Sequence, residues 1–324
     1  MQGLSRRELL AAAAAAALPL GAARAQSFPN KPVRLIAVNP PGGLTDTVSR
    51  IFSPRLQALL GQTVLVENKP GANGGVGAST LASLPADGHS FLVADGSMLT
   101  VNPLLSQKLA YDPVKDFAPV ALMGQAPLFL VVNPKLGVNT LDELVQLAKS
   151  KPGRLNYGSS GLGSTHHLTM EALKASLGLF ITHIPFRGSA ASVPAMLAGE
   201  VEMVFAAYPS IAGFLKSGQA KAIAVNSARR WPQEPNVPAI AEKIPGFDYA
   251  PNVIVLARAG TPAEAIQRVS NDIATVAKQP DAVEAARAQG VQLIGGGPAQ
   301  LSAALQKETV QMRETAKRAS LKAE

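Results

Sequence analysis

The 324-residue chain contains no cysteine, and this absence excludes several classes of protein at once. Without cysteine a chain forms no disulfide, carries no thiol nucleophile and cannot accept the lipid that anchors bacterial lipoproteins at their cleavage site. We therefore expect a fold that relies on its own hydrophobic core and a protein that is not lipid-anchored.

The sequence motifs of several enzyme classes are absent as well. The chain has no G-x-x-x-x-G-K-[ST] for phosphates, no G-x-S-x-G elbow and no H-E-x-x-H. Adjacent His166 and His167 would point about 100° apart on a helix, which makes them a poor pair of metal ligands. His89 and His183 stand alone. We expect no catalytic residue, no metal and no cofactor.

The excess of positive charge is modest. The formal net charge is +8, and residues 1–25 contribute three arginines and one glutamate, so the rest of the chain carries +6. Such a charge favours an acidic ligand or an anionic surface. No dense block of Lys and Arg with interleaved aromatic residues appears, so we expect no nucleic acid partner.

Residues 1–25 have the pattern of an export signal. Arg6 and Arg7 precede an alanine-rich apolar run that ends in Ala23-Arg24-Ala25. This pattern is typical of a cleaved signal peptide, and a paired arginine is read by the bacterial twin-arginine (Tat) route. The run is too short to span a membrane comfortably, and no later segment approaches that length. We predict a mature chain that begins at Gln26 and is soluble in the periplasm.

The remaining 299 residues are too many for one ordinary core and predict two lobes with a cleft between them. Apolar runs predict strands at 33–38, 63–67 and 90–94, and helical spacing predicts a helix at 46–60. After a strand at 128–132 the alternation restarts, with helices at 141–150 and 189–198 among its elements. Such alternation predicts mostly parallel sheets, with ligands beyond the carboxyl ends of the strands.

Three polar, glycine-rich loops follow predicted strands, at residues 39–46, 94–97 and 157–165. In the first, Gly42 and Gly43 permit unusual backbone angles, and Thr45 is expected to cap a helix that starts at Asp46. Unpaired amides at the positive end of a helix suit a carboxylate. A plain strand-to-helix turn is the alternative. The third loop belongs to the other lobe and offers hydroxyls and amides that could close on the far end of an anion.

Six sequence blocks occur in order along the chain. They are PPGGLTD (40–46), VENKPGA (66–72), YDPVKDF (111–117), LNYGS (155–159), PFRGS (185–189) and AGTP (259–262). Together they resemble the Bug family, the extracytoplasmic solute receptors of tripartite tricarboxylate transporters. The resemblance implies the α/β fold of a type II periplasmic binding protein, with two lobes joined by two crossing strands. It places the first lobe in residues 26–125 and 229–324 and the second in residues 126–228.

The resemblance also implies a function and a site. It implies a monomeric periplasmic solute-binding protein that captures a small organic carboxylate for a membrane permease. In this family backbone amides of the first lobe hold a carboxylate and the second lobe selects the rest of the ligand. Carried onto matching positions, this points to Gly42, Gly43, Thr45, Asp46, Gly96, Ser97, Ser159, Gly163, Ser164, Thr165 and Ala206.

Two positions depart from the family's usual pattern. Ala206 stands where the family often has an aspartate, and Asn252 stands where a tryptophan is common. Without that acid a ligand ammonium loses a partner, so we expect a carboxylate without an amino group. Arg187 either pairs with a second carboxylate or is a solvated surface arginine. A binding protein that signals to a sensor kinase and a hydrolase on a related fold are the alternatives, and the residues leave the identity of the carboxylate open.

Overall fold

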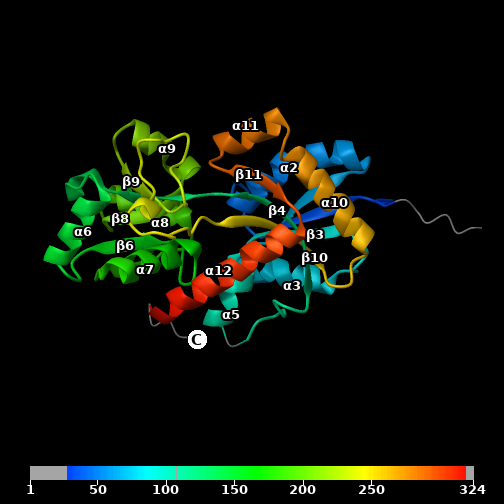
Figure 1. The fold of residues 1–324 in the computed structure, drawn as a ribbon, viewed down its shortest axis with the longest axis horizontal. Coiled ribbons are helices and arrows are strands. Elements are labelled where there is room, and N and C mark those ends of the chain that lie inside the picture. The colour runs from blue at the N-terminus through cyan, green and yellow to red at the C-terminus, as the bar shows by residue number, and fades with distance from the viewer. Residues whose placement is uncertain (1–27, 107, 319–324) are drawn as a thin grey trace, which may run out of the picture.

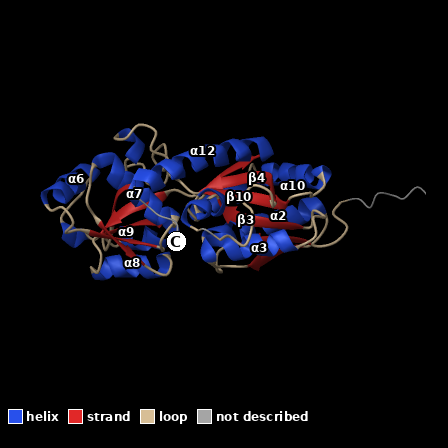
Figure 2. Cartoon of the chain, turned by 90° about the horizontal axis from the view of Figure 1, so that it is seen from below, coloured by secondary structure: helices blue, strands red, loops and turns tan. Residues whose placement is uncertain are grey.

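The computed structural model describes residues 28–106 and 108–318, so the predicted signal peptide lies outside the described residues. These described residues form two β-sheets. The two lobes lie side by side along the long axis of the molecule (Figure 1), and the strands of each lobe are enclosed by helices (Figure 2). Within the described ranges, no helix has both the length and the hydropathy of a membrane span.

The first lobe is built on a six-stranded sheet of order β11-β4-β10-β3-β1-β2. Its elements are β1 (Val33–Ala37), α2 (Leu44–Leu60), β2 (Val64–Asn68), η1 (Ala72–Gly74), α3 (Gly75–Ser83), β3 (Ser90–Asp95), α4 (Ser97–Thr100), α5 (Asn102–Leu105), β4 (Phe117–Gln125), β10 (Asn252–Arg258), α10 (Ala263–Val276), α11 (Pro280–Ala288), β11 (Gln292–Gly296) and α12 (Pro298–Arg318). β1 pairs in parallel with β2 and β3, as the alternation predicts. β10 is antiparallel to β3 and β4, and β11 is antiparallel to β4. The sheet is therefore mixed rather than mostly parallel, because the strands after the second lobe enter it in the opposite direction.

Helix α2 covers one face of this sheet and brings the first loop to the sheet edge. Val48, Phe52 and Leu56 recur every four residues and are almost completely buried. This spacing places them on one side of the helix, where they join the core cluster of the sheet. The apolar stripe of α2 thus fixes where its N-terminus lies.

The second lobe is built on a five-stranded sheet of order β7-β6-β8-β5-β9. Its elements are β5 (Leu128–Val132), η2 (Pro134–Leu136), α6 (Leu141–Ser150), β6 (Asn156–Ser159), α7 (Thr165–Leu177), β7 (Thr182–Pro185), α8 (Ser189–Ala198), β8 (Met203–Ala207), α9 (Tyr208–Lys216), β9 (Lys221–Val225) and η3 (Ile240–Glu242). β6 is parallel to β7 and β8, whereas β5 is antiparallel to β8 and β9. This sheet is also mixed, because the crossing strand β5 lies between β8 and β9 and runs antiparallel to both.

The chain crosses between the sheets twice. It first crosses between β4 and β5, and it returns between β9 and β10. The return path packs on the second sheet, because Trp231 and Val237 lie in one of its core clusters and Phe247 lies in another. We therefore propose that the second lobe extends to about residue 250, well beyond the predicted boundary at 228.

The last helix, α12, lies along the junction of the two lobes (Figure 1). Its Met312 forms a small hydrophobic cluster with Val101 of the first lobe and Leu168 of α7 in the second. Nearby, Gly163 is so close to Leu105 that a Cβ on Gly163 would lie less than 3.0 Å from Leu105 Cδ1. The lobes are therefore in direct contact beside the cleft.

Candidate functional site

The first predicted loop connects β1 to α2, and its polar side chains bond to one another. The buried Thr45 hydroxyl accepts from the Asn39 amide at 3.1 Å and donates to Asn39 Oδ1 at 3.0 Å. α2 begins at Leu44 with Gly43 in the N-cap position, so the prediction that Thr45 caps the helix is wrong. Thr45 instead ties the two ends of the loop together.

The carboxylate of Asp46 closes the same loop. It accepts hydrogen bonds from the Gly42 amide at 2.9 Å, from Arg50 Nε at 3.0 Å and from Asn68 Nδ2 at 2.9 Å. Burial alone would raise the pKa of Asp46, but the bonds from Arg50, Gly42 and Asn68 outweigh it and lower that pKa. Asp46 is thus an ionised group whose charge is already compensated inside the protein.

The open amides of this loop are those of the first helical turn. The Gly42 amide donates to Asp46, and the Gly43 amide donates to the Pro40 carbonyl at 2.9 Å. In the described part of the chain, the amides of Leu44 and Asp46 have no acceptor. Open amides at the positive end of a long helix suit an anion. The geometry therefore moves the candidate donors from Gly42 and Gly43 to the amides of Leu44 and Asp46.

Helix α7 in the second lobe begins in a similar way. The Ser164 hydroxyl is its N-cap and accepts from the His167 amide at 3.2 Å. The Gly163 amide donates to His167 Nδ1 at 3.1 Å. The amides of Thr165 and His166 have no acceptor among residues 28–106 and 108–318. Each lobe thus presents a helix start with two open amides.

Ser159 lies beneath the start of α7 and is fully buried. Its hydroxyl bonds with Gly161 and lies 2.6 Å from His183 Nε2. The His183 ring stacks on that of His167, with 4.0 Å between their centroids, and the centroid of the Tyr157 ring lies 4.9 Å from that of His183. Burial lowers the pKa of His167 to about 4, so this imidazole is neutral at pH 7. Ser159 and its neighbours therefore support the loop and add no positive charge to it.

The sequence analysis singled out two further residues, Ala206 and Arg187. Ala206 is inside β8, pairs with Phe129 and is fully buried, so its side chain has no surface to offer a ligand. Arg187 follows β7 and is exposed, and it has no ion pair within the described chain.

The second predicted loop lies against α12. The amide of Ser97 donates to the Asp95 carboxylate at 2.9 Å, and the Ser97 hydroxyl bonds to the same oxygen. A Cβ on Gly96 would lie less than 3.0 Å from both carboxylate oxygens of Glu308. Gly96 therefore permits α12 to place a carboxylate directly against this loop, a contact that the sequence analysis missed.

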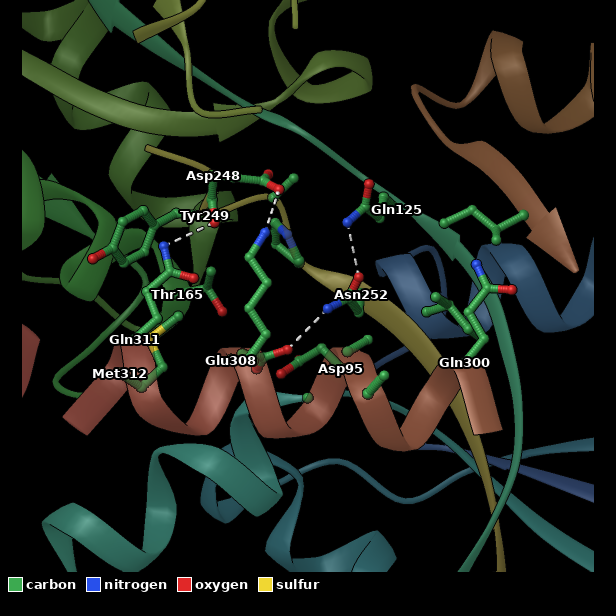
Figure 3. A pocket seen from close by; sticks show the side chains of 18 residues that line it. Asp95, Gln125, Thr165, Asp248, Tyr249, Asn252, Gln300, Glu308, Gln311 and Met312 are labelled. Carbon is green, nitrogen blue, oxygen red and sulfur yellow. Dashed lines mark hydrogen bonds and ion pairs between the residues drawn. The ribbon is translucent and has the colours of Figure 1, made fainter. Parts of the chain in front are cut away.

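Glu308 connects this loop to the two crossing strands (Figure 3). Its carboxylate accepts from the Thr100 hydroxyl at 2.9 Å and from Asn252 Nδ2 at 3.0 Å. Asn252 Oδ1 in turn accepts from Gln125 Nε2 at 2.9 Å, so β10 and β4 are tied together where they leave the sheet. Burial raises the pKa of Glu308 to about 7 against the opposing effect of its hydrogen bonds, and the charge of Asp95 adds to the rise.

A cavity of about 430 Å³ opens beside this network (Figure 3). Its volume is in the range of sites for small molecules. Its walls come from both lobes, from the crossing segments and from α12, and they include two of the predicted ligand residues, Gly96 and Thr165. The other predicted residues do not line it. Among the described residues, no group of His, Asp and Glu side chains could hold a metal ion.

Comparison with known proteins gives matches over most of the chain. Residues 48–320 match the family described as "Tripartite tricarboxylate transporter family receptor". The chain is 35% identical to the protein BugT of Bordetella pertussis over 268 residues, which is 82% of each chain. It is similar to the solved structure of Rpa4515 of R. palustris with adipate, at a TM-score of 0.84 and 31% identity over 92% of this chain and 100% of that one. It is also similar to MatC of Rhodopseudomonas palustris with bound malate, at a TM-score of 0.78 and 27% identity over 89% and 99% of the two chains.

Proposed function

Because the chain belongs to the receptor family of the tripartite tricarboxylate transporters, we propose that it is a solute-binding protein that captures a small organic carboxylate. This membership confirms the resemblance drawn from the six sequence blocks. The observation that carries the proposal is the match over nearly the whole two-lobed fold to structures that hold adipate and malate. We further propose that the protein works in the periplasm and delivers its ligand to a membrane permease, as the family description implies.

Capture in this proposal uses the two helix starts. The carboxylate binds to the open amides of Leu44 and Asp46 in the first lobe, and the amides of Thr165 and His166 engage the ligand from the second. Hydrogen bonds to a charged group contribute about 1.5–3 kcal/mol each. A few of them reach the roughly 8 kcal/mol of a micromolar complex. Since contacts from both lobes form only when the lobes approach, the ligand stabilises the closed arrangement.

A ligand screen tests the capture of carboxylates. The protein is unfolded and refolded to remove bound ligand, and its thermal stability is measured with a panel of mono- and dicarboxylates. A ligand present at about 100 times its dissociation constant should add about 2.7 kcal/mol to the free energy of unfolding. A refolded protein that is stabilised by no organic acid would contradict the proposal.

Proline substitution at the helix start tests the amide donors. Leu44→Pro removes the amide at the first helical position, where proline fits the helix and the extended backbone of Gly43 accommodates it. Loss of one charged hydrogen bond should weaken binding by about 10- to 150-fold. Leu44→Ala, which loses the same side chain but keeps the amide, is the matched control and should retain affinity. Equal affinities of the two variants, measured by titration calorimetry, would exclude this amide as a donor.

A further inference from the structure

The cavity beside the hinge has an unbalanced charge. The charged side chains on its wall are Asp95, Asp248, Lys307 and Glu308. Lys307 Nζ lies 3.3 Å from Asp248 Oδ2, so these two compensate each other. Asp95 and Glu308 have no basic partner within the described residues. The wall around Gly96 therefore carries two carboxyl groups with no cation beside them.

The neighbours of these carboxyl groups hold them in place as hydrogen-bond acceptors. Asp95 accepts from the amide and hydroxyl of Ser97, and Glu308 accepts from Thr100 and Asn252. The amide nitrogens of Asn252 and Gln125 are used within this network, since one donates to Glu308 and the other to Asn252. The polar atoms that Asp95 and Glu308 leave for a molecule in the cavity are thus carboxyl oxygens, whereas the donors on the wall come from other residues, among them Thr165, Gln300 and Lys307.

We propose that Asp95 and Glu308 determine specificity, and that the end of the ligand that enters this cavity carries a hydrogen-bond donor, a hydroxyl or an ammonium group, and not a second carboxylate. The inference rests on the proposed function, because it concerns the far end of a carboxylate held at the helix starts. The sequence-based expectation of a ligand without an amino group considered only Ala206. The structure supplies a different pair of acids, one of them from the last helix of the chain.

The charge state of the pair makes the selectivity depend on pH. Burial raises the pKa of Glu308 to about 7 and also raises the pKa of Asp95. At pH 8 Glu308 is ionised and repels a second carboxylate, whereas at pH 5.5 it is protonated and can donate a hydrogen bond to one. The other charged groups on the wall, Lys307 and Asp248, form an ion pair with each other. Discrimination against dicarboxylates should therefore weaken on acidification.

Four ligands of equal length test the proposal. Hexanoate, 6-hydroxyhexanoate, 6-aminohexanoate and adipate share one carboxylate and differ only at the far end, and adipate is the ligand of a similar structure. Calorimetric titration at pH 8 should give at least tenfold tighter binding of the hydroxy or amino acid than of adipate, and the difference should shrink at pH 5.5. If 6-hydroxyhexanoate binds tightly and 6-aminohexanoate does not, the hydrogen-bond donor of the ligand is neutral. The reverse result identifies the donor as a cation.

Variants of Asp95 and Glu308 test whether these two side chains cause the difference in ligand affinity. Glu308→Gln keeps the shape of the side chain and should bind adipate about tenfold more tightly and 6-aminohexanoate about tenfold more weakly. Asp95→Asn should act in the same direction, and a circular dichroism spectrum equal to that of the wild-type protein shows that each variant is folded. Glu314→Gln, an exposed position on the same helix, should change none of these affinities.

Two results would overturn the inference, and only the second of them would also overturn the proposed function. If adipate binds the wild-type protein most tightly at pH 8, the inference fails and carboxylate capture stands. If none of the four acids binds, and the full panel of mono- and dicarboxylates also fails to stabilise the refolded protein, the proposed function falls and the inference falls with it.

Discussion

Replacement of Gly163 by alanine tests whether contact between the lobes belongs to the binding mechanism. Gly163 has a φ of +73°, and a Cβ there would lie less than 3.0 Å from Leu105 Cδ1 of the first lobe. The left-handed backbone costs an alanine about 1–2 kcal/mol. Overpacking against Leu105 costs a further amount of about 1–3 kcal/mol. We expect the free energy of unfolding to fall by about 2–5 kcal/mol, the sum of the two contributions.

Gly178 provides the matched control. It ends α7 with a φ of +64°, and a Cβ there would have no heavy atom within 4 Å. Gly178→Ala therefore carries the backbone cost without the steric one and should lose only about 1–2 kcal/mol. The difference between the two variants reports the contact with Leu105.

Urea denaturation and calorimetric titration give the two measurements. Gly163→Ala should also weaken ligand binding by at least tenfold, because it pushes the lobes apart, whereas Gly178→Ala should leave affinity unchanged. In the double variant Leu105→Ala/Gly163→Ala the loss should be smaller than the sum of the single losses. If the two glycine variants lose equal stability and bind ligand equally well, the contact plays no part in closure and the reasoning is refuted.

Three further predictions concern stability. The pKa of Glu308 is raised from 4.5 to about 7, so the folded state holds a proton that the unfolded state has lost, and the free energy of unfolding falls as the pH rises through this range. Glu308→Gln should remove roughly 3 kcal/mol of this pH dependence, measured by urea denaturation at pH 5 and pH 8. The pKa of His167 is lowered from 6.5 to about 4, so the unfolded state takes up a proton first and the free energy of unfolding falls as the pH drops through this range. In His167→Asn the free energy of unfolding should depend less on pH between about 6.5 and 4, and an unchanged dependence would contradict this. Thr45→Val removes the hydroxyl that bonds Asn39 and should cost about 1–2 kcal/mol in urea denaturation, with no loss indicating that the loop is held otherwise.

Local patterns predicted much of the second lobe well. The helices predicted at residues 141–150 and 189–198 have these bounds in the structure, as does the strand at 128–132. In the first of these helices a local signal explains the agreement, because the Thr140 hydroxyl accepts from the Glu143 amide at its start. An apolar stripe and a cap are encoded by neighbours in the sequence, so a single sequence suffices to find them.

The pairing of strands that are distant in the sequence could not be predicted from such local patterns. β10 reads as an apolar strand, but nothing local shows that it lies between β3 and β4 and makes the sheet mixed. The burial of Trp231 in the second lobe likewise depends on a sheet formed by earlier residues. This burial is the reason for which we propose a lobe boundary later in the sequence than residue 228.

The sequence predicted where two of the loops lie between strands and helices, but not which of their amides are open. The loops at 39–46 and 157–165 do lie where strands end and helices begin. Which amides remain open depends on internal hydrogen bonds, such as that from Gly42 to Asp46, and these follow from geometry alone. Glu308 gave no signal, since one glutamate in a lysine-rich helix looks like any solvated residue.

The place of β10 in the sheet has a consequence for synthesis. A chain that has been translated only as far as β9 contains every strand of the second sheet, but β3 and β4 still lack the strand that lies between them. Their open edges are templates for pairing with other chains until β10 arrives. The lobe that begins first is therefore completed last, and a chain that stops before Asn252 should aggregate even though its second lobe is whole.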